Sequence, residues 1–299
     1  MDRHQESDVH DQGLQADLVA LRAQFDRRGL LKLLGGTAAL VLVGCGDDRR
    51  SRAPAPTTAP STAVSGATTA ATADEQAVAT VTPIPTQSTP ASACTDAIPQ
   101  ETAGPFPADG SNGPNVLVQS GIVRRDIRSS FGISSTVAEG VQLTVRLRIV
   151  DTRNGCRPLP GTAVYLWHCD AKGGYSIYEL PNENYLRGVQ VADDDGWVTF
   201  ESVFPGCYAG RWPHIHFEVY PGVERATSSA NKLATSQLAL PREVCEAVYA
   251  RAEYGNSARN LSGLSLETDG IFRDGWQQQL AAVTGDAETG YTATLVVGL

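Results

Sequence analysis

The clearest pattern of hydrophobic and polar positions lies in residues 141–150, where apolar and polar residues alternate over nine positions. The apolar positions are Val141, Leu143, Val145, Leu147 and Ile149. A period of two is typical of a β-strand with one buried face. The pattern therefore predicts a strand over 141–150 whose odd-numbered side chains face a core.

Several further segments have the composition of short strands. They are residues 163–168, 197–204, 215–220, 237–240 and 291–297. Turn-forming pairs such as Asp195-Gly196 and Pro205-Gly206 separate several of them. One helix is predicted over 241–252, because Pro241 suits the first turn of a helix. Together these segments predict an all-β fold, an antiparallel β-sandwich with one or two short helices.

The first 45 residues have the organisation of an export signal. Two arginines, at 27 and 28, precede an apolar run over 33–44, which is too short to span a bilayer as a helix. This arrangement resembles a twin-arginine signal, and the LVGC sequence ending at Cys45 resembles a bacterial lipobox. We therefore expect residues 1–45 to be a twin-arginine-type lipoprotein signal. The mature protein would be exported, extracytoplasmic and anchored to the bacterial membrane through lipid on Cys45.

The segment 46–93 is predicted to be a disordered linker. Between residues 53 and 93, 32 of 41 residues are Ala, Thr, Pro or Ser, and only Asp74 and Glu75 are charged. Such a composition cannot bury enough apolar surface to offset the entropy lost on ordering. One folded domain, residues 94–299, is expected to follow it.

Composition and charge exclude several classes of partner. The chain has 299 residues and a formal net charge of −9, with no run of Lys or Arg after the N-terminal region. Nucleic-acid binding requires a basic footprint, so no nucleic-acid partner is expected. A glycine-rich phosphate loop with its lysine is also missing from the sequence. A small molecule is therefore the expected partner.

The six cysteines form no C-x-x-C pair, which argues against a structural zinc site. If Cys45 carries lipid, five remain. These are Cys94, Cys156, Cys169, Cys207 and Cys245. An odd number allows at most two disulfides, the expected use in an exported domain, and buried reduced thiols are the alternative.

Four side chains carry the candidate chemistry. His214 and His216 alternate within a predicted strand, so both imidazoles face one side, ~6.6 Å apart along the chain, and can converge on one metal. Tyr175 and Tyr208 lie in glycine-flanked turns at strand ends, where sites are usually assembled. Taken singly, a His-x-His pair can also be a polar strand face, and a tyrosine is most often a hydrogen-bonded core ring.

The order of these residues resembles the intradiol ring-cleavage dioxygenases, the family of catechol 1,2-dioxygenase and protocatechuate 3,4-dioxygenase. The similar blocks lie within about 94–240 and are 101–106, 158–167, 175–176, 186–188, 195–196, 205–206, 208 and 211–216. The resemblance implies a prealbumin-like sandwich and a non-haem Fe(III) held by Tyr175, Tyr208, His214 and His216. It also implies intradiol cleavage of catechol-type substrates with O2 to muconate-type dicarboxylates.

The chemistry of this ligand set suits ferric iron. Free tyrosine has a pKa near 10, and a trivalent ion supplies enough charge to remove its proton. Phenolate oxygens are hard donors that favour Fe(III), which would act as a Lewis acid on a catecholate. By the same resemblance, Tyr208 is displaced by substrate and can receive its proton. Arg211 stabilises charge that develops on the substrate, and Gln237 is a hydrogen-bond partner behind the iron ligands.

Some features depart from the family pattern or stay open. Only five residues separate Tyr208 from His214, as in an exported, lipoprotein-like branch of the family, and the helical dimerisation region of the catechol enzymes is absent. The oligomeric state is therefore left open. Glu218 is expected behind the metal ligands or in solvent, and His168 in a core hydrogen bond. Phe106, Tyr185 and Trp212 are candidate pocket walls.

Two other functions are compatible with parts of the sequence. A cupin or zinc enzyme with three histidines would have to recruit His168, because no histidine follows His216. A non-catalytic, prealbumin-like binding module would need neither tyrosine. Colour distinguishes them, because tyrosinate bound to ferric iron absorbs visible light.

Overall fold

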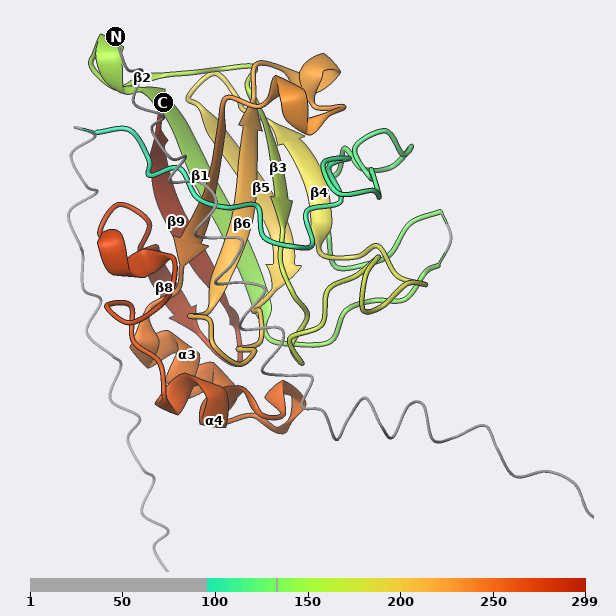
Figure 1. Ribbon diagram of the computed structural model, residues 1–299, viewed down its shortest axis with the longest axis vertical. Helices are drawn as coiled ribbons and strands as arrows, with labels where there is room; N and C mark the ends of the chain where they lie inside the picture. Colours follow the sequence, from blue (N-terminus) through green and yellow to red (C-terminus); the bar gives the residue numbers. More distant parts are fainter. Residues whose placement is uncertain (1–95, 133) are drawn as a thin grey trace, which may run out of the picture. The chain divides into compact units, whose positions relative to one another are not determined.

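The computed structural model describes residues 96–132 and 134–299, and the predicted signal and linker lie outside this range. The described residues form two β-sheets with few short helices, as the hydrophobic pattern predicts (Figure 1). No helix in this part of the chain is both long enough and apolar enough to cross a bilayer.

The first sheet has five strands. Its members are β1 (Gln142–Asp151), β2 (Arg157–Pro158), β5 (Trp197–Val203), β8 (Ala282–Asp286) and β9 (Gly290–Gly298). β1 pairs antiparallel with β2 and β5, but β1 and β9 run parallel over eight residue pairs, from Leu143↔Tyr291 to Val150↔Gly298. The prediction of an antiparallel sandwich is therefore wrong for this pair. Strands so far apart in the chain have no hairpin to fix their direction.

The second sheet has four strands in the order β4-β3-β6-β7, all antiparallel. Their bounds are β4 Arg187–Val191, β3 Ala163–Trp167, β6 His214–Tyr220 and β7 Ala234–Ala239. Every residue of β3, β6 and β7 is buried. Both faces of this sheet are therefore covered, and alternate residues of each strand enter two different environments.

The face of the second sheet that looks toward the first contributes to a shared apolar core. Leu147 of β1 and Phe200 of β5 belong to one buried cluster with Phe217 of β6 and Leu238 of β7. The predicted alternation in β1 is confirmed, because its odd positions from 143 to 149 are buried. Burial of this apolar area is the main force that holds the two sheets together.

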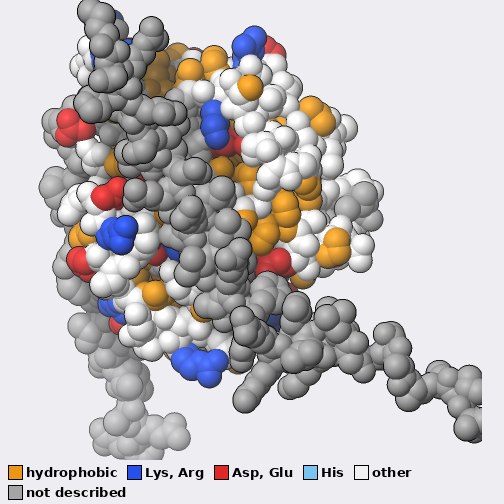
Figure 2. All heavy atoms as spheres, viewed as in Figure 1, with side chains coloured by type: hydrophobic (Ala, Val, Ile, Leu, Met, Phe, Trp, Pro, Cys, Tyr) orange, Lys and Arg blue, Asp and Glu red, His pale blue; other side chains and the backbone are white. Residues whose placement is uncertain are grey.

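The opposite face of the second sheet is aromatic and polar. It carries Tyr165 and Trp167 from β3, and it packs against residues of the segment before β1, including Phe106, Ala108 and Leu117. The alternation of β6 places its two histidines on this face. The three histidines of the described residues are all buried, and none is visible on the face drawn in Figure 2.

Two helices follow β7 and lie at one end of the sheets (Figure 1). They are α3 (Arg242–Tyr249) and α4 (Ser257–Ser262). α3 begins at Arg242, one residue later than predicted, because Pro241 is the extended residue before the helix, and it ends at Tyr249, three residues earlier than predicted, before a 3-10 turn. The 3-10 helices are η1 Thr152–Asn154, η2 Val223–Arg225, η3 Ser229–Asn231, η4 Ala252–Tyr254 and η5 Phe272–Asp274.

Only some of the described cysteines follow the expectation that they form disulfides. Cys169, Cys207 and Cys245 are free and buried, whereas Cys156 is disulfide-bonded. Burial raises the pKa of the Cys207 thiol to about 12, so it stays protonated at neutral pH. Buried, reduced thiols, the alternative in the sequence analysis, describe these three residues.

Candidate metal centre

The histidine pair lies at the start of β6, on the aromatic face of the second sheet. The Nε2 atoms of His214 and His216 lie 3.1 Å apart, so the expected placement of both rings on one face is confirmed. The hydroxyl of Tyr208 lies 3.1 Å from Nε2 of His214. Three potential donor atoms from the turn before β6 and from β6 itself therefore meet at one place.

Tyr175 completes the group from the loop after β3. Its ring centroid lies 6.0 Å from that of Tyr208 and 6.3 Å from that of His216. The side chain is only 3% exposed and packs against Phe106 at 5.2 Å between ring centroids. Tyr208 is partly exposed by contrast. The structure thus brings together the four residues predicted as metal ligands.

The position of the proton on His214 is set by the backbone carbonyl of Trp212. Its Nδ1 lies 2.5 Å from the carbonyl oxygen of Trp212, which can only accept, so Nδ1 carries the proton and Nε2 keeps a lone pair. Burial, together with the positive charge of Arg211, holds the pKa of His214 well below its usual value. Burial and His214 do the same to the pKa of His216. Both rings are therefore neutral at pH 7, the form that ligates metals.

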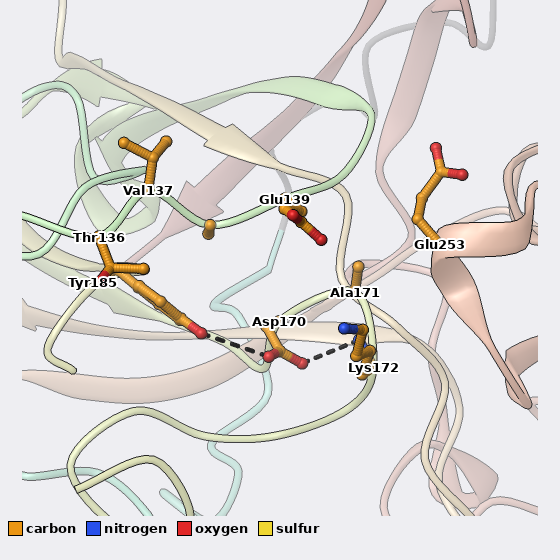
Figure 3. A pocket seen from close by; sticks show the side chains of 9 residues that line it. Thr136, Val137, Glu139, Asp170, Ala171, Lys172, Tyr185 and Glu253 are labelled. Atoms are coloured by element: carbon orange, nitrogen blue, oxygen red, sulfur yellow. Dashed lines mark hydrogen bonds between the residues drawn. The ribbon is translucent and has the colours of Figure 1, made fainter. Parts of the chain in front are cut away.

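The two tyrosine-bearing loops are fastened to each other at Asp170. Its carboxylate oxygen Oδ1 accepts from the backbone N–H groups of Lys172 and Gly174, and its carbonyl oxygen accepts from the N–H of Gly206. These contacts hold the turn before Tyr175 against the turn before Tyr208. The Asp170 side chain also lines a pocket of about 260 Å³, shown in Figure 3.

That pocket is distinct from the histidine–tyrosine group. Tyr185 lines it and donates to Oδ2 of Asp170 at 3.4 Å (Figure 3). Trp212 is buried and donates through Nε1 to the carbonyl oxygen of Leu240. Tyr185 and Trp212 belong to other buried clusters than Tyr175, whereas Phe106 contacts Tyr175 directly.

A glycine makes the close approach of the two loops possible. A Cβ added at Gly206 would lie 2.5 Å from the carbonyl oxygen of Ala171 and 2.8 Å from its carbon, both backbone atoms. We expect Gly206→Ala to destabilise the fold by roughly 1–3 kcal/mol, the usual cost of overpacking, and to weaken metal binding. The matched control is Gly263→Ala, where a Cβ meets nothing within 4 Å. Equal thermal unfolding of the two variants would contradict this account of the contact.

Arg211 lies beside the histidines and is held from two sides. Its Nε donates to Oδ2 of Asp269 at 3.1 Å, and its Nη2 donates to Oε1 of Gln237 at 2.7 Å. Gln237 pairs with His216 across β6 and β7, and its Nε2 donates to the carbonyl oxygen of Thr102. The guanidinium is fully buried and fixed in direction, as a group that stabilises developing charge should be.

Asp269 was not found from the sequence. Besides Arg211, its carboxylate accepts from the backbone N–H groups of Trp212, Ile271 and Phe272. It therefore joins the turn before β6 to the loop that carries Phe272, whose ring lies 6.4 Å from that of His214. In the sequence this aspartate stands before a glycine, as in many turns, so no local signal marks its role.

His168 and Glu218, whose roles the sequence left undecided, both have hydrogen-bond partners in the structure. His168 is buried with Nδ1 at 2.7 Å from the carbonyl oxygen of Cys169 and Nε2 at 2.7 Å from Oγ of Ser202, as expected for a core histidine. Glu218 is fully buried rather than in solvent. It accepts from Tyr220 Oη at 2.6 Å and from Lys232 Nζ at 3.0 Å. Burial raises the pKa of Glu218 to about 7.

Glu101 lies near enough to Arg211 to feel its charge, and its shifted pKa predicts how stability depends on pH. Burial first, then the charge of Asp274, raises its pKa from 4.5 to about 7. Because the pKa of this carboxyl is higher in the folded state, its contribution to folding stability is fully present below pH 4.5. That contribution is lost as the pH rises through about 7. We expect Glu101→Gln to reduce the fall in melting temperature across this range. Glu288→Gln, at an exposed carboxyl, should leave the slope unchanged, and equal slopes in both variants would refute the assignment.

The donor set fits a metal that accepts phenolate and imidazole. Two donors bonded about 2.1 Å from a shared ion at right angles lie about 3.0 Å apart, close to the separations at His214. Among residues 96–132 and 134–299, no group of three or more His, Cys, Asp or Glu could hold a metal ion. A metal at the histidine pair therefore needs the tyrosines. The structure also argues against the three-histidine alternative, because both ring nitrogens of His168 are already hydrogen-bonded.

The chain is similar in sequence to known dioxygenases. The matching family model is described as Dioxygenase and covers residues 124–214. Catechol 1,2-dioxygenase of Pseudomonas sp. (strain EST1001) is 33% identical over 95 residues, which are 25% of this chain and 32% of that protein. Together these matches indicate the intradiol ring-cleavage dioxygenase family. The residues matched by the Dioxygenase model include Tyr175, Tyr208, Arg211 and His214.

Two solved dioxygenase structures are similar to this chain. The intradiol ring-cleavage dioxygenase from Tetranychus urticae is similar with a TM-score of 0.49 and 25% identity, over 60% of this chain and 88% of that one. A second dioxygenase crystal structure gives a TM-score of 0.50 and 25% identity, over 60% of this chain and 87% of that one. The chain spans about a third of the length of the curated catechol dioxygenase that it matches.

Proposed function

We propose that this intradiol-family protein is a non-haem ferric dioxygenase that splits catechol-type rings between the two hydroxyl-bearing carbons. O2 is the oxidant, both its atoms enter the product, and the product is a muconate-type dicarboxylate. The observation that supports this most is the meeting of Tyr208, His214 and His216 at separations of 3.1 Å, with the Tyr175 ring beside them. As part of the same proposal, the two sheets form the family's prealbumin-like sandwich.

The four residues would hold the iron in unequal roles. His214 and His216 are neutral nitrogen donors, and Tyr175 and Tyr208 would bind as phenolates. Ferric iron, when bound, supplies the positive charge that lowers the pKa of phenolic O–H groups and binds a catecholate. Tyr175 is buried against Phe106, so we assign it the permanent phenolate. Tyr208 is partly exposed, so it can move aside and take a substrate proton on its phenolic oxygen.

Arg211 and Gln237 contribute orientation and charge. The guanidinium cannot lose its proton and is pinned between Asp269 and Gln237, so its positive charge stays at one place during the reaction. A fixed charge in a buried site stabilises negative charge developing on the ring without reorganisation. Gln237 therefore acts through Arg211, by fixing the direction of the guanidinium.

Metal analysis combined with oxygen uptake tests the proposed function. We expect the purified protein to hold about one iron per chain, to be red to brown, and to consume O2 with catechol but not with resorcinol, which lacks adjacent hydroxyls. A colourless protein with zinc would support a hydrolase instead. A colourless protein that binds catechol without O2 uptake would support the binding-module alternative. Either result would overturn the proposal.

We also propose that the protein acts outside the cytoplasm on a lipid tether at Cys45. This rests on the sequence of residues 1–93, which lie outside the described part of the structure. Labelling of the full chain with a fatty-acid analogue should be lost in Cys45→Ala and kept in Cys94→Ala. Equal labelling of both variants would contradict the tether.

A further inference from the structure

The two histidines of the candidate centre are oriented by different means. His214 donates its Nδ1–H to the carbonyl oxygen of Trp212, which fixes the direction of its ring. Nδ1 of His216 is buried and has no hydrogen-bond partner among the described residues. Histidines that bind metals nearly always use their second nitrogen in a hydrogen bond that sets ring orientation. The contact that the structure shows on the ring of His216 is of another kind.

The indole of Trp167 supplies that contact. Trp167 faces His216 directly across β3 and β6, and the two rings stack with centroids 4.9 Å apart and planes only 5° from parallel. Trp167 is fully buried, and its Nε1 has no hydrogen-bond partner among the described residues. The indole therefore acts here through its flat face rather than through its N–H group.

The stack continues away from the metal centre to a fixed anchor. Tyr165 also stacks on Trp167, at 4.9 Å between centroids and 19° between planes. The Tyr165 hydroxyl donates to the carbonyl oxygen of Pro107 and accepts from Nη1 of Arg187. The same buried arginine binds Oγ and the carbonyl oxygen of Ser176, the residue after Tyr175. Arg187 thus holds both Tyr165, at the end of the His216 stack, and the loop that carries Tyr175.

We propose that Trp167 is the positioning residue for His216, holding the imidazole by ring stacking in place of the hydrogen bond that orients His214. The proposal rests on the proposed iron centre and extends it to a residue that touches neither substrate nor iron. Offset stacking is one of the favoured arrangements of two aromatic rings, and a buried indole against the imidazole face leaves that ring little room to rotate. Loss of a partner that orients a metal ligand typically lowers metal affinity about 10–100-fold.

The test compares Trp167→Phe with Trp167→Leu in the full chain loaded with ferric iron. Both variants shorten the side chain, leucine somewhat more, but only phenylalanine keeps a flat face. The rate of iron loss to an excess of chelator is followed by total iron and by visible absorption. We expect Trp167→Leu to lose iron at least 10-fold faster than Trp167→Phe. Trp197→Leu, which changes a tryptophan on the other sheet, should lose iron at the wild-type rate.

The outcomes separate this inference from the proposed function. Iron loss from the Phe and Leu variants at rates within threefold would overturn the positioning role while leaving the iron centre intact. Failure of the wild-type chain to bind ferric iron would overturn the centre itself. Melting temperatures of the iron-free forms show whether Trp167→Leu folds. If it does not, Trp167→Met takes its place, because methionine fills irregular space without a flat face.

Discussion

Tyr175→Phe is expected to abolish ring cleavage and visible colour while the protein stays folded. The change removes one oxygen atom and keeps a ring that is packed against Phe106. Because the lost atom is the proposed permanent phenolate, iron affinity should fall by more than the roughly 10–100-fold that loss of a supporting partner costs. Iron content after dialysis, visible absorption and O2 uptake with catechol measure the effect.

Tyr178→Phe is the matched control for that variant. Tyr178 packs against the same Phe106 ring at 4.9 Å, but its hydroxyl donates to Oδ1 of Asn112, away from the histidines. It should keep iron, colour and turnover. Normal iron content in Tyr175→Phe would show that this phenol is not a ligand, and equal losses in both variants would point to packing instead.

Arg211→Gln is expected to reduce both stability and turnover. The arginine and Asp269 form an ion pair in which both side chains are fully buried. Removal of one partner leaves the other charge uncompensated, which typically costs 3–5 kcal/mol. For a domain of this size the melting temperature should fall by roughly 6–20 °C. Turnover should fall about 100–1000-fold, as when a group that stabilises developing charge is removed.

A double variant separates the two effects. Arg211→Gln combined with Asp269→Asn removes the uncompensated carboxylate, so it should regain part of the lost stability but none of the lost turnover. Arg251→Gln breaks an exposed pair with Glu253 and should change neither property. Wild-type turnover in Arg211→Gln would exclude the guanidinium from the reaction.

The elements with a strong local signal were predictable from the sequence. Alternation in residues 141–150 predicts β1, and the His-x-His alternation predicts the shared face that brings the two Nε2 atoms to 3.1 Å. The short strand β4 was missed because its RGVQV sequence has little alternation. β8 was missed because most of its residues are exposed.

Contacts between distant parts of the chain were not predictable. The parallel pairing of β1 and β9 depends on tertiary packing, because no turn joins the two strands. Asp269 contacts Arg211 across 58 residues, and Arg187 contacts the carbonyl oxygen of Phe106 across 81. Such partners have no fixed spacing from the residues that they hold. Sequence motifs thus marked the residues proposed to bind iron, and only the structure showed what supports them.

Anomalous diffraction at the iron absorption edge, from crystals of the iron-loaded full chain, tests the central claim most directly. We predict one iron peak within about 2.0–2.2 Å of the phenolic oxygens of Tyr175 and Tyr208 and of Nε2 of His214 and His216. A peak beside His168, or no peak at the histidine pair in protein shown by chemical analysis to contain iron, would contradict it.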